Sequence, residues 1–124
     1  EKMLTTNQLS PEELAEQARI DQERAEQEAQ KIRERNRLNR QIEILNMQIQ
    51  RKKNEISELE NSMASHPDIV VPFQDPIPYK ESEQYQKDLA KHEKLKEELD
   101  ALESELAELE QQKADLEAQL QTAE

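Results

Sequence analysis

The chain has 124 residues, of which 33% are hydrophobic and 37% are charged, and its formal net charge is −12. So few apolar side chains cannot build a thick core or line an enzyme-like pocket. Glycine and cysteine are both absent, which excludes glycine-rich phosphate loops, disulfides and cysteine-ligated zinc. The only two histidines, His66 and His92, are far apart in the sequence. We therefore expect no enzymatic activity, no catalytic residues, no cofactor and no metal.

The first helix has a well-defined start signal. Residues 1–9 show no helical periodicity and are expected to form an extended tail. Ser10 can then cap a helix by accepting from the backbone N–H of Glu13, and Pro11 occupies the first helical position, where its missing donor costs nothing. No proline or glycine follows until after Ala64, so one long helix is predicted over residues 10–64.

Apolar residues recur along this helix at alternating steps of four and three, the heptad pattern of a helix that packs along a partner helix. Lys52 occupies one polar position in this seam. The phase shifts near residues 32–38, so the part before it is expected to pair more loosely. The seam residues of the first helix are Leu38, Ile42, Leu45, Ile49, Ile56, Leu59 and Met63.

A proline-rich connector is predicted over residues 65–80, because four of the five prolines fall there. Proline restricts its neighbours to extended backbone, so no helix crosses the segment. The connector is also unusually apolar for a linker. One interpretation is a recognition element that docks on a protein partner, and the other is a loop that folds back to cover Met63 and Tyr85. Its candidate partner-binding residues are Ile69, Val70, Val71, Phe73, Ile77 and Tyr79.

A second long helix is predicted over residues 81–123, and its heptad pattern is more regular than that of the first. Lys113 replaces one leucine of the seam. The seam residues of the second helix are Leu95, Leu99, Leu102, Leu106, Leu109, Leu116 and Leu120.

The charges favour pairing of the two helices with each other. Parallel self-pairing of the second helix would place glutamates opposite glutamates. Residues 31–53 hold eight Lys/Arg against two Glu, whereas residues 97–124 hold ten Asp/Glu against one Lys. We predict an all-α fold, a long antiparallel two-helix coiled-coil hairpin, with His92 near Lys52. The alternative is a pair of separate intermolecular coiled coils joined by the connector.

Folding the chain back at the connector also places three residues of the first helix opposite Leu99, Leu102 and Leu106 of the second. These three residues are Ile42, Leu45 and Ile49.

Three arginines of the first helix fall at outer heptad positions, where they are candidates for contact with a third helix or another partner: Arg37, Arg40 and Arg51. The basic stripe over residues 31–53 also fits nucleic-acid binding, but it contains no stacking aromatic residue and the whole chain is acidic. We expect neither nucleic-acid binding nor membrane insertion.

These features favour a structural or scaffolding subunit, or a fragment of one, that bridges or braces a larger protein assembly. Its partners are expected to be proteins, helical ones above all, and self-association is compatible with the seams. A second interpretation is an adaptor or chaperone-like module that binds one protein partner. A third is a nucleic-acid-associated factor that uses the basic stripe. The composition predicts a soluble protein, with the cytoplasm as the default compartment.

Overall fold

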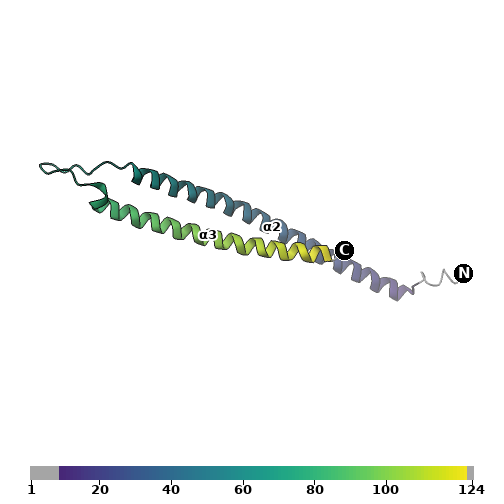
Figure 1. Ribbon diagram of the computed structural model, residues 1–124. Helices are drawn as coiled ribbons and strands as arrows, with labels where there is room; N and C mark the ends of the chain where they lie inside the picture. The colour runs from purple at the N-terminus through teal and green to yellow at the C-terminus, as the bar shows by residue number, and fades with distance from the viewer. Residues whose placement is uncertain (1–8, 123–124) are drawn as a thin grey trace. The chain divides into compact units, whose positions relative to one another are not determined.

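The computed structural model describes residues 9–122, which form an all-α helical hairpin (Figure 1). Helix α2 spans Pro11–Ala64 and helix α3 spans Glu83–Thr122, with a short 3-10 turn, η1, at Tyr79–Glu81. The two long helices pack against each other, so the fold class predicted from the heptad seams is confirmed. The tail predicted over residues 1–9 lies outside the described residues except for Leu9, and so does the predicted helix end at residue 123.

The start of α2 has the predicted cap. The backbone N–H of Glu13 donates to Ser10 Oγ at 3.1 Å, and the backbone N–H of Leu14 donates to the Ser10 carbonyl at 2.9 Å. Glu12 and Glu13 lie in the first turn, where their negative charge suits the positive end of the helix dipole. Local sequence therefore fixes this helix boundary.

α2 ends before the proline-rich connector, and α3 begins two residues later than predicted. Ser65 Oγ donates a hydrogen bond of 2.9 Å to the Asn61 carbonyl and so satisfies an acceptor in the last turn of α2, just before Pro67. The predicted second helix starts at residue 81, but Glu81 belongs to η1 and α3 begins only at Glu83. Ser82 has extended backbone angles there, which end one helical segment and start the next.

The hairpin divides into two packing units. One consists of the described residues up to Asn39 with those from Gln112 onward, and the other is Arg40–Gln111. Both contain a stretch of α2 and a stretch of α3.

Within the unit Arg40–Gln111, two cross-helix pairs fix the register. Lys52 Nζ lies 2.7 Å from Glu98 Oε2, and His92 Nε2 lies 3.7 Å from Glu60 Oε2. The predicted proximity of His92 to Lys52 is therefore wrong, because His92 lies about two helical turns further along α2. The error arises because heptad spacing alone allows a helix to slide along its partner by whole repeats.

The seam residues form the interior of both units. Leu38 is only 1% exposed, and Leu45, Ile49, Ile56 and Leu95 are also buried. The remaining seam residues are half-buried, as expected where only two helices meet and each seam keeps an open flank. These half-buried residues are Ile42, Leu59, Met63, Leu99, Leu102, Leu106, Leu109, Leu116 and Leu120.

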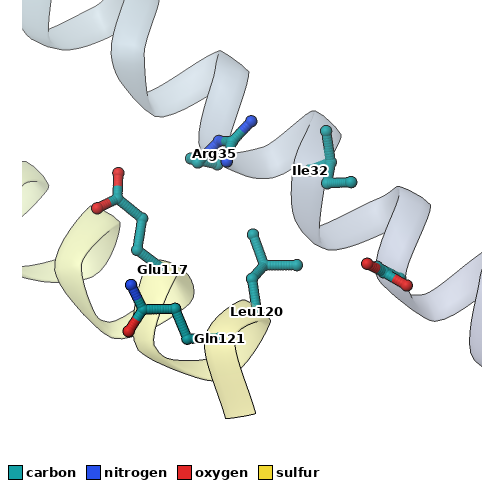
Figure 2. Close-up of a pocket in the computed structure, with 6 residues that line it drawn as sticks. Ile32, Arg35, Glu117, Leu120 and Gln121 are labelled. Atoms are coloured by element: carbon teal, nitrogen blue, oxygen red, sulfur yellow. The ribbon is translucent and has the colours of Figure 1, made fainter. Parts of the chain in front are cut away.

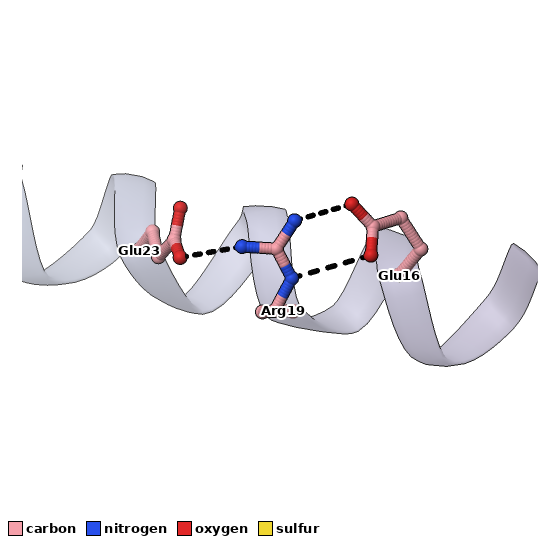
Figure 3. Close-up of polar contacts among 3 residues, drawn as sticks. All are labelled: Glu16, Arg19 and Glu23. Atoms are coloured by element: carbon pink, nitrogen blue, oxygen red, sulfur yellow. Dashed lines mark hydrogen bonds and ion pairs between the residues drawn. The ribbon is translucent and has the colours of Figure 1, made fainter.

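The N-terminal part of α2 extends beyond the end of α3 (Figure 1). Its residues are exposed up to Glu28, apart from the half-buried Ile20. This stretch is supported by pairs within the helix, since Arg19 contacts Glu16 through two nitrogens and also bonds Glu23 at 2.7 Å (Figure 3). Spacings of three and four residues place such side chains on the same helix face.

Candidate interaction surfaces

The connector is a short extended loop closed by one antiparallel bridge. The backbone N–H of Ile69 donates to the Ile77 carbonyl at 2.8 Å, and the N–H of Ile77 donates back at 2.9 Å. Between them, the N–H of Gln74 donates to the Val71 carbonyl at 3.2 Å and closes a turn. The bridge therefore gives a proline-rich segment a defined shape with a narrow tip.

Tyr79 anchors the base of the connector. Its side chain is only 5% exposed, and its ring stacks on His66 with the centroids 4.1 Å apart. The Tyr85 ring packs edge-on against it at 5.2 Å, and Tyr79 Oη donates to Asp88 Oδ2 at 2.5 Å. One aromatic side chain thus joins the end of α2, the connector and the first turns of α3.

The hydrogen bond shifts the pKa values of Tyr79 and Asp88 in opposite directions. Desolvation, assisted by the hydrogen bond to Asp88, raises the pKa of Tyr79 to about 12. The hydrogen bond from Tyr79 lowers the pKa of Asp88, and a further hydrogen bond from Gln84 acts in the same direction. The pair is therefore a neutral phenol donating to a carboxylate over a wide pH range.

Ser82 links this anchor to α3. It is buried, its Oγ donates to the Tyr79 carbonyl at 2.6 Å, and the same oxygen accepts from the backbone N–H of Tyr85 at 3.2 Å. The second bond is an N-cap for α3. The capping residue is thus held by the anchor, so the start of α3 and the base of the connector are positioned together.

The tip of the connector is apolar and points into solvent. Phe73 is fully exposed, at 107% of its reference area, and Val70 is 82% exposed. Phe73 also adopts a φ of 63°, a left-handed conformation that bulky residues rarely occupy. The tip therefore combines a fully exposed ring with a strained backbone, a kind of strain that clusters at functional sites.

The predicted connector residues differ in how far they are exposed. Tyr79 is buried and Ile69, Val71 and Ile77 are half-buried, as a covering loop requires. The other two face outward, as a recognition element requires; they are Val70 and Phe73.

The three outer arginines also differ from one another. Arg37 bonds Glu34 of the same helix through two nitrogens, one at 2.9 Å, and this pairing lowers the pKa of Glu34. Arg40 and Arg51 are exposed, and within residues 9–122 neither forms an ion pair. Arg37 is thus engaged within its own helix, whereas the side chains of Arg40 and Arg51 are exposed and form no ion pair within residues 9–122.

Two exposed apolar residues of α2 were missed by the sequence reasoning. Ile44 is 54% exposed and Met47 is 57% exposed. A signal was present, because Arg40, Ile44, Met47 and Arg51 follow one another at steps of four, three and four, and so form a second stripe along one side of α2.

A shallow groove in the other packing unit lies between α2 and the end of α3 (Figure 2). Ile32 and Arg35 of α2 face Glu117, Leu120 and Gln121 of α3. Arg35 Nε is buried there without a hydrogen-bond partner. The groove combines a guanidinium and a carboxylate with aliphatic side chains, a lining that suits helix packing better than chemistry.

Within residues 9–122, no three acidic or histidine side chains gather closely enough to hold a metal ion. Neither helix has, within those residues, an apolar stretch that could cross a lipid bilayer. The chain matches no protein-family model, no curated protein and no solved structure.

Proposed function

We propose that this chain is a non-enzymatic structural element that braces a protein assembly through its paired helices, with the connector tip as its contact. The single observation that carries the proposal is the exposed ring of Phe73 on a backbone with positive φ. Exposed aromatic residues at such tips are typical anchors of protein interfaces, where they bury a large area at low entropic cost.

The anchor beneath the tip supports this assignment. The Ile69–Ile77 bridge and the packing of Tyr79 on His66 hold the connector at both ends. A loop that is already ordered loses less conformational entropy when it binds, so each apolar contact at the tip contributes more to affinity. The expected occupant is an apolar pocket on a protein, since the tip exposes the apolar side chains of Val70 and Phe73.

Photo-crosslinking tests the proposal directly. A photoreactive phenylalanine analogue is placed at Phe73 of the full chain in its native cells, with a matched control at Glu93, an exposed residue of α3. We expect discrete protein adducts from position 73 that are absent from position 93. Equal adducts from both positions, or none from position 73, would rule the tip out as the contact.

A second variant separates binding from folding. Phe73→Asn removes the ring but keeps a residue that tolerates a left-handed backbone. Recovery of the crosslinked protein with the tagged variant should fall at least about tenfold, in line with the loss of an aromatic interface anchor. The helical content should stay unchanged. Undiminished recovery would show that the ring is not used.

A further inference from the structure

The unit Arg40–Gln111 has a second surface that is independent of the connector. A groove runs between α2 and α3 on one side of the hairpin, and we call this side the groove face. Its lining residues are Gln41, Ile44, Leu45, Gln48, Glu105 and Leu109.

The groove face is apolar along its middle. Leu45 and Leu109 of the two seams lie at its floor, and Ile44 stands on its α2 rim. Met47 lies one turn further along α2 and is exposed to a similar degree as Ile44. Large side chains exposed side by side on a helix that already has a packed seam indicate a second contact.

The two rims of this face carry opposite charges. Arg40 and Arg51 lie before and after the apolar pair in the stripe on the outer side of α2 that borders the groove, and they have no ion pair within residues 9–122. On the α3 rim, Glu105 is joined by Glu108, three residues further along the same side of the helix. Along the groove, α2 therefore carries basic residues and α3 carries acidic ones.

We propose that the groove face is a self-association surface, on which two copies of this chain pack face to face with α2 of each copy against α3 of the other. A two-fold axis parallel to the helices produces this arrangement and forms both contacts at once. It places the Arg40 and Arg51 rim of each copy against the acidic rim that holds Glu105 and Glu108 in the second copy. Ile44 of each copy then meets the groove at the level of Leu109 in the second copy.

Charge selects this arrangement over other self-pairings. Packing α2 against α2 would bring arginines of the two copies together whether the helices ran parallel or antiparallel, because Arg40 and Arg51 lie at both ends of the apolar pair. Packing α3 against α3 would bring Glu105 and Glu108 against their own copies. Of these pairings, only α2 against α3 brings opposite charges together along the groove.

The half-buried leucines of α3 support an added layer of helices. Leu99, Leu102, Leu106 and Leu109 are not buried by the hairpin alone. A second hairpin on the groove face converts two helices into a four-helix arrangement, in which such seam positions acquire neighbours on their open flank. The connectors of both copies would lie at the same end.

Light scattering and sedimentation of the full chain, from micromolar to millimolar concentrations, test the proposal. The expected mass at high concentration is twice that of the 14.6 kDa chain. A wild-type chain that stays monomeric throughout would overturn the proposal.

Charge reversal identifies the two rims. Arg40→Glu with Arg51→Glu makes both rims acidic, and Glu105→Arg with Glu108→Arg makes both basic, so each double variant should dimerise at least about tenfold more weakly than the wild type. Mixing the two double variants should restore a dimer, because each acidic rim then meets a basic one. Dimers that ignore both reversals, or a mixture that remains monomeric, would contradict the proposed pairing.

A matched control uses the opposite side of the hairpin. A residue just before a seam position lies on one side of the hairpin, and a residue just after a seam position lies on the other. The groove face holds residues of the first kind, namely Gln41, Gln48 and Glu105. Lys53 and Lys96 are of the second kind. Lys53→Glu with Lys96→Glu therefore changes the net charge as much as the Arg40 and Arg51 pair does, but on the other side. This variant should dimerise like the wild type, and circular dichroism should show unchanged helical content in all variants.

Discussion

Lys52 Nζ donates a hydrogen bond of 2.7 Å to Glu98 Oε2 across the seam between α2 and α3, although the two residues are 46 positions apart in the sequence. Lys52 occupies the one polar position among the seam residues of α2 between Leu38 and Met63, and its side chain is mostly shielded from water. The hydrogen bond lowers the pKa of Glu98 and raises that of Lys52. A polar position inside a heptad seam fixes the register of two helices, because any shift leaves the charge without its partner.

Exchange of the charges at this position tests its role in the register. Lys52→Glu should lower Tm by several degrees, since two carboxylates then face each other in the seam. Lys52→Glu combined with Glu98→Lys should recover most of the loss. Thermal unfolding followed by circular dichroism measures both changes. If the double variant were no more stable than Lys52→Glu alone, the pair would have no part in specifying the register.

The hydrogen bond from Tyr79 to Asp88 predicts a pH window for stability. The pKa of Tyr79 is raised in the folded chain. Its contribution to folding stability is therefore complete below the pKa of an unfolded tyrosine, about 10, and is lost as pH rises toward about 12. The pKa of Asp88 is lowered in the folded chain. Its contribution to folding stability is therefore complete above the pKa of an unfolded aspartate, about 3.9, and is lost as pH falls through the folded-state pKa. Stability should thus fall at both extremes.

Spectrophotometric titration of a Tyr85→Phe variant isolates Tyr79 as the only tyrosine. We expect ionisation near pH 12 in the folded chain. Asp88→Asn removes the neighbouring negative charge but leaves an acceptor, so the pKa of Tyr79 should fall while staying above about 10 because burial persists. A pKa of about 10 in the Tyr85→Phe chain itself would show that Tyr79 is not held in this buried contact.

The helices and the apolar seams could be predicted from sequence because they depend on local and periodic signals. Ser10, Pro11 and Glu13 define the start of α2 through interactions within one turn. Each seam position follows from the period of the helix, which is the same wherever the partner lies.

The register and the connector tip depend on contacts that periodicity does not encode. The pairing of His92 with Glu60 was missed because sliding by a heptad preserves every apolar match. Val70 and Val71 have the same side chain, yet only Val70 is strongly exposed, since the direction of each depends on the Ile69–Ile77 bridge. The positive φ of Phe73 likewise has no local sequence signal, because no glycine or asparagine marks it.

The serine caps of the two helices should differ in their effect on stability. Ser82 is buried and bonded to both Tyr79 and Tyr85, so Ser82→Ala should cost about 1 kcal/mol and lower the midpoint of urea unfolding. Ser10 caps an exposed end, so Ser10→Ala should speed amide exchange at Glu13 and barely change that midpoint. Equal shifts from both variants would mean that the start of α3 is not coupled to the anchor.

The burial of Leu38 predicts that truncating this side chain will strongly destabilise the packing unit that contains it. Its side chain is 1% exposed, whereas Leu14 on the same helix is 54% exposed. Leu38→Ala should therefore destabilise the hairpin by about 2 to 5 kcal/mol, and Leu14→Ala should stay within about 0.5 kcal/mol of the wild type. Both substitutions bring in the same alanine within α2, so helix propensity contributes equally and the difference reports packing. Urea unfolding of the two variants measures that difference, and equal losses would mean that Leu38 is not enclosed by neighbouring side chains.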